Sequence, residues 1–127
     1  MDKTTNSLNW FEIPVLDLER AKHFYQVSFS IHLEEMSMNE TQMALFPSEA
    51  GSGKVSGALV KSNWHTPGTA GSIVYLNANP SMNPVIERIK SEGGIVHVEK
   101  SPIGSDIGYW ALFSDSEGNT IGLHSME

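Results

Sequence analysis

The side chains with which this chain of 127 residues can do chemistry are five histidines and fifteen acidic residues, since it contains no cysteine. Without thiols it has no disulfides, no thiolate metal ligands and no cysteine nucleophile. No two histidines have the His-x-x-x-His spacing that places two metal ligands on one helical face. We therefore expect no cofactor and no metal held by a histidine motif.

Two further motif classes are missing. The glycine-containing segment 51–54 (GSGK) lacks the spacing and the strand-to-helix context of a phosphate-binding loop, and it predicts a hairpin turn instead. No Gly-x-Ser-x-Gly motif is present for the nucleophile of a hydrolase.

The acidic excess limits the partners of the protein. Fifteen acidic side chains against eight basic ones give a formal net charge of −7 at pH 7. That charge repels nucleic acid and acidic membrane surfaces. No apolar run reaches the roughly 20 residues of a membrane span, and the opening residues lack the apolar stretch of a signal peptide. We expect a cytoplasmic protein with no nucleic-acid and no membrane partner.

The elements that position the polar side chains begin with a strand and a helix. The apolar and aromatic segment 8–15 predicts a strand, and Asp17 predicts the N-cap of a helix. The apolar residues of that helix share one face, namely Leu18, Ala21, Phe24 and Tyr25. Segments 31–38, 42–46 and 55–61 predict three further strands.

The second half of the chain repeats this order. Segment 72–78 predicts a strand, and Asn83 followed by Pro84 predicts an N-cap and a first helical position. The buried stripe of this helix contains Val85, Ile86 and Ile89, and Gly93-Gly94 ends it. Three more strands are predicted over 95–98, 109–113 and 120–124, with a tight turn at 117–119.

Short sequence similarities indicate an internal duplication. Segments 44–46 and 111–113 are both Ala-Leu-Phe, and each precedes a Ser/Glu/Gly turn and a strand with glycine and leucine. The order strand–helix–strand–strand–strand therefore occurs twice. We predict an α+β fold in a single domain, residues 1–127, with one module over about residues 8–62 and the other over about 71–125.

Two motifs resemble those of a known superfamily. Segment 11–25 (FEIPVLDLERAKHFY) resembles the opening of the glyoxalase/bleomycin-resistance/extradiol-dioxygenase superfamily, also called vicinal oxygen chelate. Segment 109–124 (YWALFSDSEGNTIGLH) resembles its closing hairpin. The resemblance covers about residues 8–125 and is nearest to glyoxalase-like proteins of uncharacterised function. It implies two βαβββ modules whose curved mixed sheets form a cavity, commonly completed in a homodimer.

The resemblance also places the superfamily's metal-ligand positions on this chain, at Trp10, at Gly57 or Ala58, at Ser72 and at Gly122. Metal-dependent members typically have His or Glu there, because divalent ions bind imidazole nitrogen and carboxylate oxygen. Indole, glycine and alanine offer no ligand atom, and a neutral serine hydroxyl is a poor one. A shift by one residue would turn the side chains to the opposite face. We therefore predict a cavity without a metal.

A carboxylate, an imidazole and aromatic groups are predicted to line that cavity instead. Period-two alternation places Trp10 and Glu12 on one face of the first strand, and Gly122 and His124 share the inward face of the last. Glu12 and His124 are the candidate catalytic residues, as a general acid–base pair. The candidate ligand-binding residues are Trp10, Ser72, Tyr109 and Gly122. The structural alternative is a Glu12 bonded to backbone N–H groups and a capped His124 near the C-terminus.

Two loops are candidates for covering the cavity. Segment 101–110 has glycines that supply hinges for a lid, and Tyr109 and Trp110 face opposite sides of the strand that follows; an ordinary connecting loop is the alternative. In the loop 62–68, Trp64 either covers the cavity or packs on a neighbouring subunit. His65 of the same loop is a weaker candidate than His124.

These features predict a protein that binds a small apolar or mixed-polarity molecule in a metal-free cavity, with a second copy of the chain as its partner. Sequestration of the kind performed by bleomycin-resistance proteins is one version that the resemblance implies. The alternative is a lyase, isomerase or dioxygenase-type enzyme of the same superfamily that uses Glu12 and His124. A structural or interaction protein is the third reading.

Overall fold

The computed structural model describes all residues, 1–127, and contains two four-stranded sheets and two helices. The first module consists of β1 (Trp10–Pro14), α1 (Leu18–Phe29), β2 (Glu34–Met38), β3 (Thr41–Leu45) and β4 (Ser56–Lys61). The second consists of β5 (Tyr75–Asn77), α2 (Asn83–Ser91), β6 (Ile95–Gly104), β7 (Gly108–Ser114) and β8 (Thr120–Ser125).

The two sheets have the same topology. Sheet A has the strand order β1-β4-β3-β2, and sheet B has the order β5-β8-β7-β6. In each sheet the first strand of the module pairs in parallel with the last, and the other pairs are antiparallel. The predicted α+β fold with a strand–helix–strand–strand–strand order in each half is therefore confirmed.

The two helices begin in different ways. The Asp17 carboxylate accepts a hydrogen bond from the Arg20 N–H at 3.0 Å, as predicted for an N-cap. In α2 the N-cap is Met82 and not Asn83, which is already helical. The Met82 N–H instead donates to the Ser125 hydroxyl at 3.1 Å, so a strand residue holds the start of this helix.

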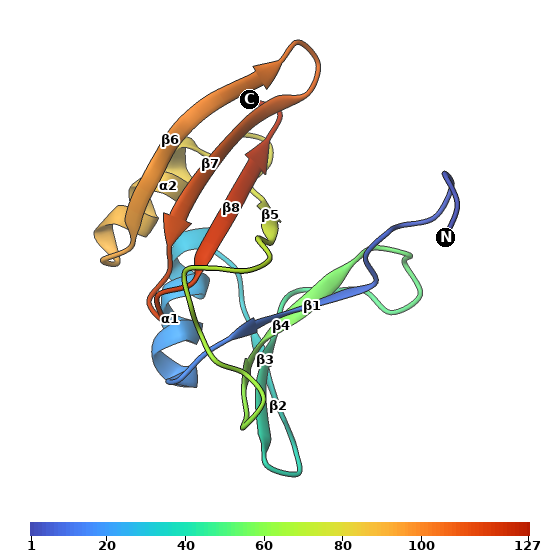
Figure 1. Ribbon diagram of the computed structural model, residues 1–127, viewed down its shortest axis with the longest axis vertical. Helices are drawn as coiled ribbons and strands as arrows, with labels where there is room; N and C mark the ends of the chain where they lie inside the picture. The colour runs from blue at the N-terminus through green and yellow to red at the C-terminus, as the bar shows by residue number, and fades with distance from the viewer.

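One apolar core joins the two modules. It contains the buried faces of both helices together with inward side chains of both sheets, such as Ile13 of β1 and Leu123 of β8. Figure 1 shows the two sheets diverging from the helices, with β1 and β4 running out towards the N-terminus. The opposite face of each sheet is turned away from this core, and we name these surfaces outer face A and outer face B. No helix combines the length and the apolar character needed to cross a membrane.

Two strands of the second module differ from their predicted bounds. β5 has only three residues and is an edge strand, since only β8 pairs with it. Ser72 lies before this strand, in irregular structure. β6 continues to Gly104 and pairs with β7 through several register shifts. Segment 101–110 therefore lies almost entirely in a β-hairpin and not in a loop, and its role as a lid stays a prediction.

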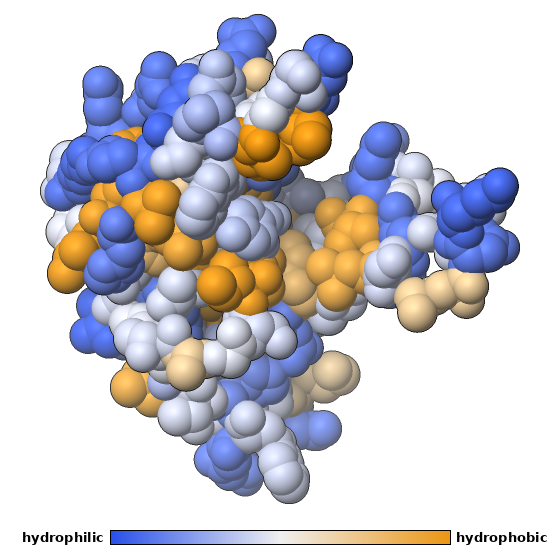
Figure 2. All heavy atoms as spheres, turned by 45° about the horizontal axis from the view of Figure 1, so that its top comes forward, coloured by the Kyte–Doolittle hydropathy of each residue, from blue (hydrophilic) through white to orange (hydrophobic).

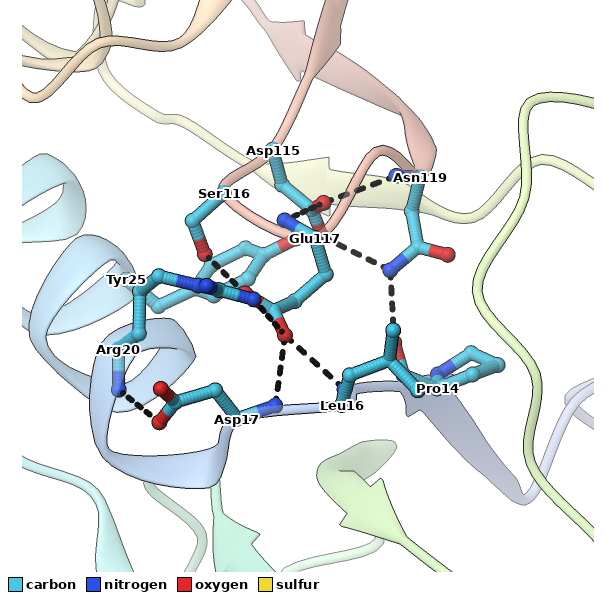
Figure 3. A network of polar contacts seen from close by, with 9 residues as sticks. All are labelled: Pro14, Leu16, Asp17, Arg20, Tyr25, Asp115, Ser116, Glu117 and Asn119. Carbon is cyan, nitrogen blue, oxygen red and sulfur yellow. Dashed lines mark hydrogen bonds and ion pairs between the residues drawn. The ribbon is translucent and has the colours of Figure 1, made fainter.

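A clasp of polar contacts fixes the β7–β8 turn to the start of α1 (Figure 3). The buried Glu117 carboxylate accepts backbone N–H bonds from Leu16 at 2.9 Å and Asp17 at 2.8 Å. The Arg20 guanidinium donates to both oxygens of the same carboxylate, at 2.7 and 3.0 Å. Contacts from the second module thus fix the C-terminal end of β1, the strand that contains Trp10 and Glu12.

A second set of contacts lies deeper in the same junction. The buried Tyr25 hydroxyl donates to Asp115 at 2.6 Å, and the Asn119 amide donates to Asp115 at 3.0 Å and to the Pro14 carbonyl at 2.8 Å. Burial, followed by the Asp115 charge, raises the pKa of Tyr25 well above its ordinary value. The phenol therefore stays a neutral donor.

Candidate functional site

Outer face A combines a carboxylate with an indole and a small apolar patch. In β1 the buried Ile13 points to the core, whereas Trp10 and Glu12 point the other way, and Trp10 is 43% exposed. Glu12 is the neighbour of Ala58 on β4. The patch beside it consists of Met43, Ala58 and Val60, which form a cluster separate from the main core, with Leu45 packed against it. The predicted orientation of Trp10 and Glu12 agrees with this geometry.

His65 is the imidazole that contacts Glu12. The His65 Nε2 atom lies 2.6 Å from Glu12 Oε2, and the Trp10 indole N–H donates to Glu12 Oε1 at 3.3 Å. The side chains of Glu12 and His65 are 38% and 20% exposed. Both carboxylate oxygens therefore have a partner, while the group remains open to solvent on one side.

The loop after β4 brings His65 to this position. The Ser62 hydroxyl accepts the Trp64 N–H at 3.0 Å, and the Ser62 carbonyl accepts the His65 N–H at 3.4 Å, so the chain turns back on itself. The Ser62 Oγ also lies 2.6 Å from His65 Nδ1, which fixes the ring at both nitrogens. Trp64 is 93% exposed and covers nothing within this chain.

Outer face B contains the other predicted residues of the last strand. The register of β7 and β8 pairs Trp110 with His124, and the register of β5 and β8 pairs Tyr75 with Gly122. The His124 Nε2 atom lies 2.7 Å from the Ile107 carbonyl oxygen, a bond that holds the imidazole to the β6–β7 turn. His124 has no contact with Glu12, so one chain does not bring the predicted acid–base pair together.

Tyr109 does not lie on the face that contains His124. It pairs with Ser125 in the register of β7 and β8 and packs against the main core, with the Lys100 ammonium 4.4 Å from its ring centre. The alternation of β7 places Trp110 on outer face B instead. The aromatic residue beside His124 is therefore Trp110, and a ligand contact of Tyr109 stays a prediction.

Ser72 belongs to a different surface, a groove of about 1000 Å³ between the edge strands β1 and β5. Phe11 and Tyr75 line opposite sides of this groove, and apolar residues predominate in it. Figure 2 shows orange, apolar atoms on both sides of the hollow between the body of the molecule and the arm that leads to the N-terminus. Glu12 and His124 do not line this groove.

The superfamily's metal-ligand positions do not fit a metal in this chain. Trp10 presents an indole that is already bonded to Glu12, and Ala58 presents a buried methyl group. At Gly122 the Tyr75 ring fills the space of a side chain, since an added Cβ would lie 2.5 Å from its Cδ1. No three His, Cys, Asp or Glu side chains converge in a geometry that holds an ion.

Several solved structures have this architecture. Maize (Zea mays) glyoxalase I superposes with a TM-score of 0.70 at 20% identity, over 91% of this chain and 43% of that one. TnmS3, an antibiotic-binding protein from Streptomyces sp. CB03234, gives 0.64 at 21% identity over 99% and 100% of the two chains. A glyoxylase/bleomycin resistance protein/dioxygenase domain from Frankia sp. EAN1pec gives 0.70 at 14% identity over 96% and 98%.

No protein-family model and no curated protein matches the sequence. The protein is an α+β protein built from two similar modules. Its fold is that of the glyoxalase/bleomycin-resistance/dioxygenase superfamily, which confirms the resemblance of segments 11–25 and 109–124. This chain spans less than half of the maize glyoxalase I chain.

Proposed function

We propose that the protein binds a small molecule of apolar or mixed polarity on outer face A, in a metal-free cavity that a second copy of the chain completes. The observation that carries this proposal is the Glu12 carboxylate, which His65 and Trp10 hold beside a small apolar cluster. A few fixed polar groups in an apolar lining are typical of small-molecule sites. The antibiotic binding stated for TnmS3 supports the same class of function.

A homodimer is part of this proposal, because the outer faces expose large apolar side chains. Trp10, Met36 and Met38 are all more than 40% exposed and lie on outer face A. Exposed apolar surface of this kind marks contact sites. If outer face B of a partner packs here, His124 reaches the cavity of Glu12, as the sequence predicts.

The lack of cysteine supports a cytoplasmic location.

Binding is tested with N-phenyl-1-naphthylamine, an uncharged fluorescent probe of apolar cavities. We expect its emission to rise on binding and the melting temperature of the protein to rise with probe concentration, by mass action. Trp10→Ala should weaken the binding of the probe by about 10-fold or more, since burial of an aromatic side chain contributes roughly 1.5–3 kcal/mol. The matched control is Leu16→Ala, whose side chain is exposed on the β1–α1 connection. Equal affinity of the Trp10 variant and the wild type would contradict the proposed position.

The metal-free state has its own measurement. Protein purified without chelator should contain well under one equivalent of zinc, nickel, manganese or iron per chain, because the superfamily's metal-ligand positions offer only the poor serine hydroxyl of Ser72. A stoichiometric ion bound by side chains of two copies would refute this part of the proposal.

The acid–base alternative is favoured by one observation, the 2.6 Å contact between Glu12 and His65. A lyase or isomerase of this fold would use Glu12 as the proton acceptor, with His65 beside it and His124 supplied across the dimer. For any turnover found, Glu12→Gln should lower the rate by at least about 100-fold. A variant that keeps its rate would leave ligand binding as the function.

A further inference from the structure

Ser62, His65 and Glu12 form a continuous chain of polar contacts at the end of β4. The Ser62 Oγ lies 2.6 Å from His65 Nδ1, and His65 Nε2 lies 2.6 Å from Glu12 Oε2. The Trp10 indole N–H donates to the other oxygen of that carboxylate. A hydroxyl beside an imidazole that a carboxylate orients is the arrangement that activates a nucleophile. Ligand binding alone does not require this order.

The protonation pattern follows from the three partners. An ionised Glu12 only accepts, so His65 carries its proton on Nε2 and donates it to the carboxylate. The lone pair of Nδ1 then accepts the Ser62 O–H. In the familiar serine triad Nε2 faces the serine and Nδ1 faces the carboxylate. Here the two nitrogens have the opposite partners, because Ser62 precedes His65 by three residues on the same turn and lies on the Nδ1 side of the ring.

The hydroxyl lies near the surface, and a donor lies beside it. Ser62 is half-buried, its neighbour Trp64 is 93% exposed, and the Glu12 side chain is 38% exposed. The backbone N–H of Asn63 directly follows the serine and has no acceptor within the protein. An N–H in that position stabilises the oxyanion that forms when a serine attacks a carbonyl.

We propose that Ser62 is an acyl acceptor and that the protein hydrolyses small carboxylic esters with a good leaving group. Ser62 Oγ bonds to the carbonyl carbon while its proton moves to His65 Nδ1. The bond from that carbon to the leaving oxygen breaks, and the leaving oxygen takes the proton. Water then gives a proton to Nδ1 and bonds to the acyl carbon, and Ser62 leaves with that proton. Glu12 stabilises the imidazolium in both steps.

This activity is independent of the cavity ligand and of a second copy of the chain, so its failure would leave the proposed binding function standing. The test uses p-nitrophenyl acetate for turnover and a fluorophosphonate for labelling, in which the Oγ–P bond forms and fluoride leaves. We expect mass spectrometry to place the phosphonyl group on Ser62. Ser62→Ala and Glu12→Gln should each slow ester hydrolysis by at least about 100-fold.

The chain supplies a matched control. His97 Nε2 lies 2.6 Å from the Ser114 hydroxyl, a hydroxyl–imidazole contact of the same length that uses the other ring nitrogen and has no carboxylate on the ring. Ser114→Ala should leave labelling and turnover unchanged, which separates an activated serine from a serine that merely touches a histidine. Wild-type protein that shows no label on Ser62 would overturn the proposal. Glu12→Gln does not alter the Ser62 turn. Turnover at the wild-type rate in that variant would therefore also overturn the proposal.

Discussion

Two glycines of the sheets differ in what a side chain would meet. At Gly57 an added Cβ would collide with the backbone oxygen of Phe11, which cannot move without breaking the β1–β4 pairing. At Gly122 it would meet only the ring of Tyr75, a side chain that is 49% exposed. The backbone pairing therefore requires glycine at position 57, whereas only a side-chain contact favours glycine at position 122.

This difference predicts the stability of two alanine variants. Gly57→Ala should lower the free energy of unfolding by about 2–3 kcal/mol, the cost of overpacking against rigid backbone. Gly122→Ala should lower it by less than about 1 kcal/mol, because Tyr75 turns into solvent. Denaturant unfolding of both variants checks the prediction, and a larger loss at Gly122 than at Gly57 would contradict it.

Single residues of the site were predictable from sequence only where a strand fixes their direction. Alternation in β1 correctly predicts that Trp10 and Glu12 share a face. It does not reveal the contact of Glu12 with His65, because a loop and 53 residues of chain separate the two. The Ser-x-x-His spacing of Ser62 and His65 was the available signal, since a turn of that length brings the two side chains together.

At the scale of elements, the helix faces and strand order followed from periodicity, and the exceptions have local causes. The α2 N-cap was misplaced because Ser125, more than 40 residues away, satisfies the amide that precedes Asn83. The hairpin of β6 and β7 was predicted as a loop, because Pro102 and the glycines of segment 101–110 are typical of turns. Register shifts accommodate these residues within the paired strands.

The clasp between the β7–β8 turn and α1 predicts an acid-sensitive junction. Burial raises the pKa of Glu117, but the Arg20 guanidinium and the amides of Asp17 and Leu16 outweigh it, so the pKa lies below the ordinary 4.5. The clasp is therefore fully present above that value and is lost as the pH falls through the lower folded pKa. Glu117→Gln should destabilise the protein by about 1–3 kcal/mol at pH 7 and flatten the acid limb of its stability curve.

Unfolding monitored by circular dichroism from pH 7 to pH 3 measures this effect. Glu99→Gln is the control, since Glu99 pairs with Lys90 in an exposed ion pair. An acid limb that is identical in the Glu117 variant and the wild type would show that another carboxylate determines the acid sensitivity.

At the scale of the whole molecule, the shared core makes the two modules one unit, and we propose that residues 1–127 form a single domain with its modules near residues 8–62 and 71–125. The exposed outer faces predict a dimer. Sedimentation should give a mass of two chains, and Met38→Glu, which adds charge to outer face A, should shift it towards one. Leu16→Glu, on the β1–α1 connection, should leave the mass unchanged. A wild-type mass of one chain at micromolar concentration would contradict the proposed homodimer.

All three tryptophans lie outside the shared core: Trp10 on outer face A, Trp110 on outer face B and Trp64 on the exposed loop. The aromatic residues of that core are phenylalanine and tyrosine, chiefly Phe24, Tyr25 and Phe113. Native indole emission is consequently an optical signal of whatever approaches the two sheet surfaces. A titration followed at tryptophan wavelengths reads occupancy without any attached dye, while tyrosine absorbance follows the packing of the interior.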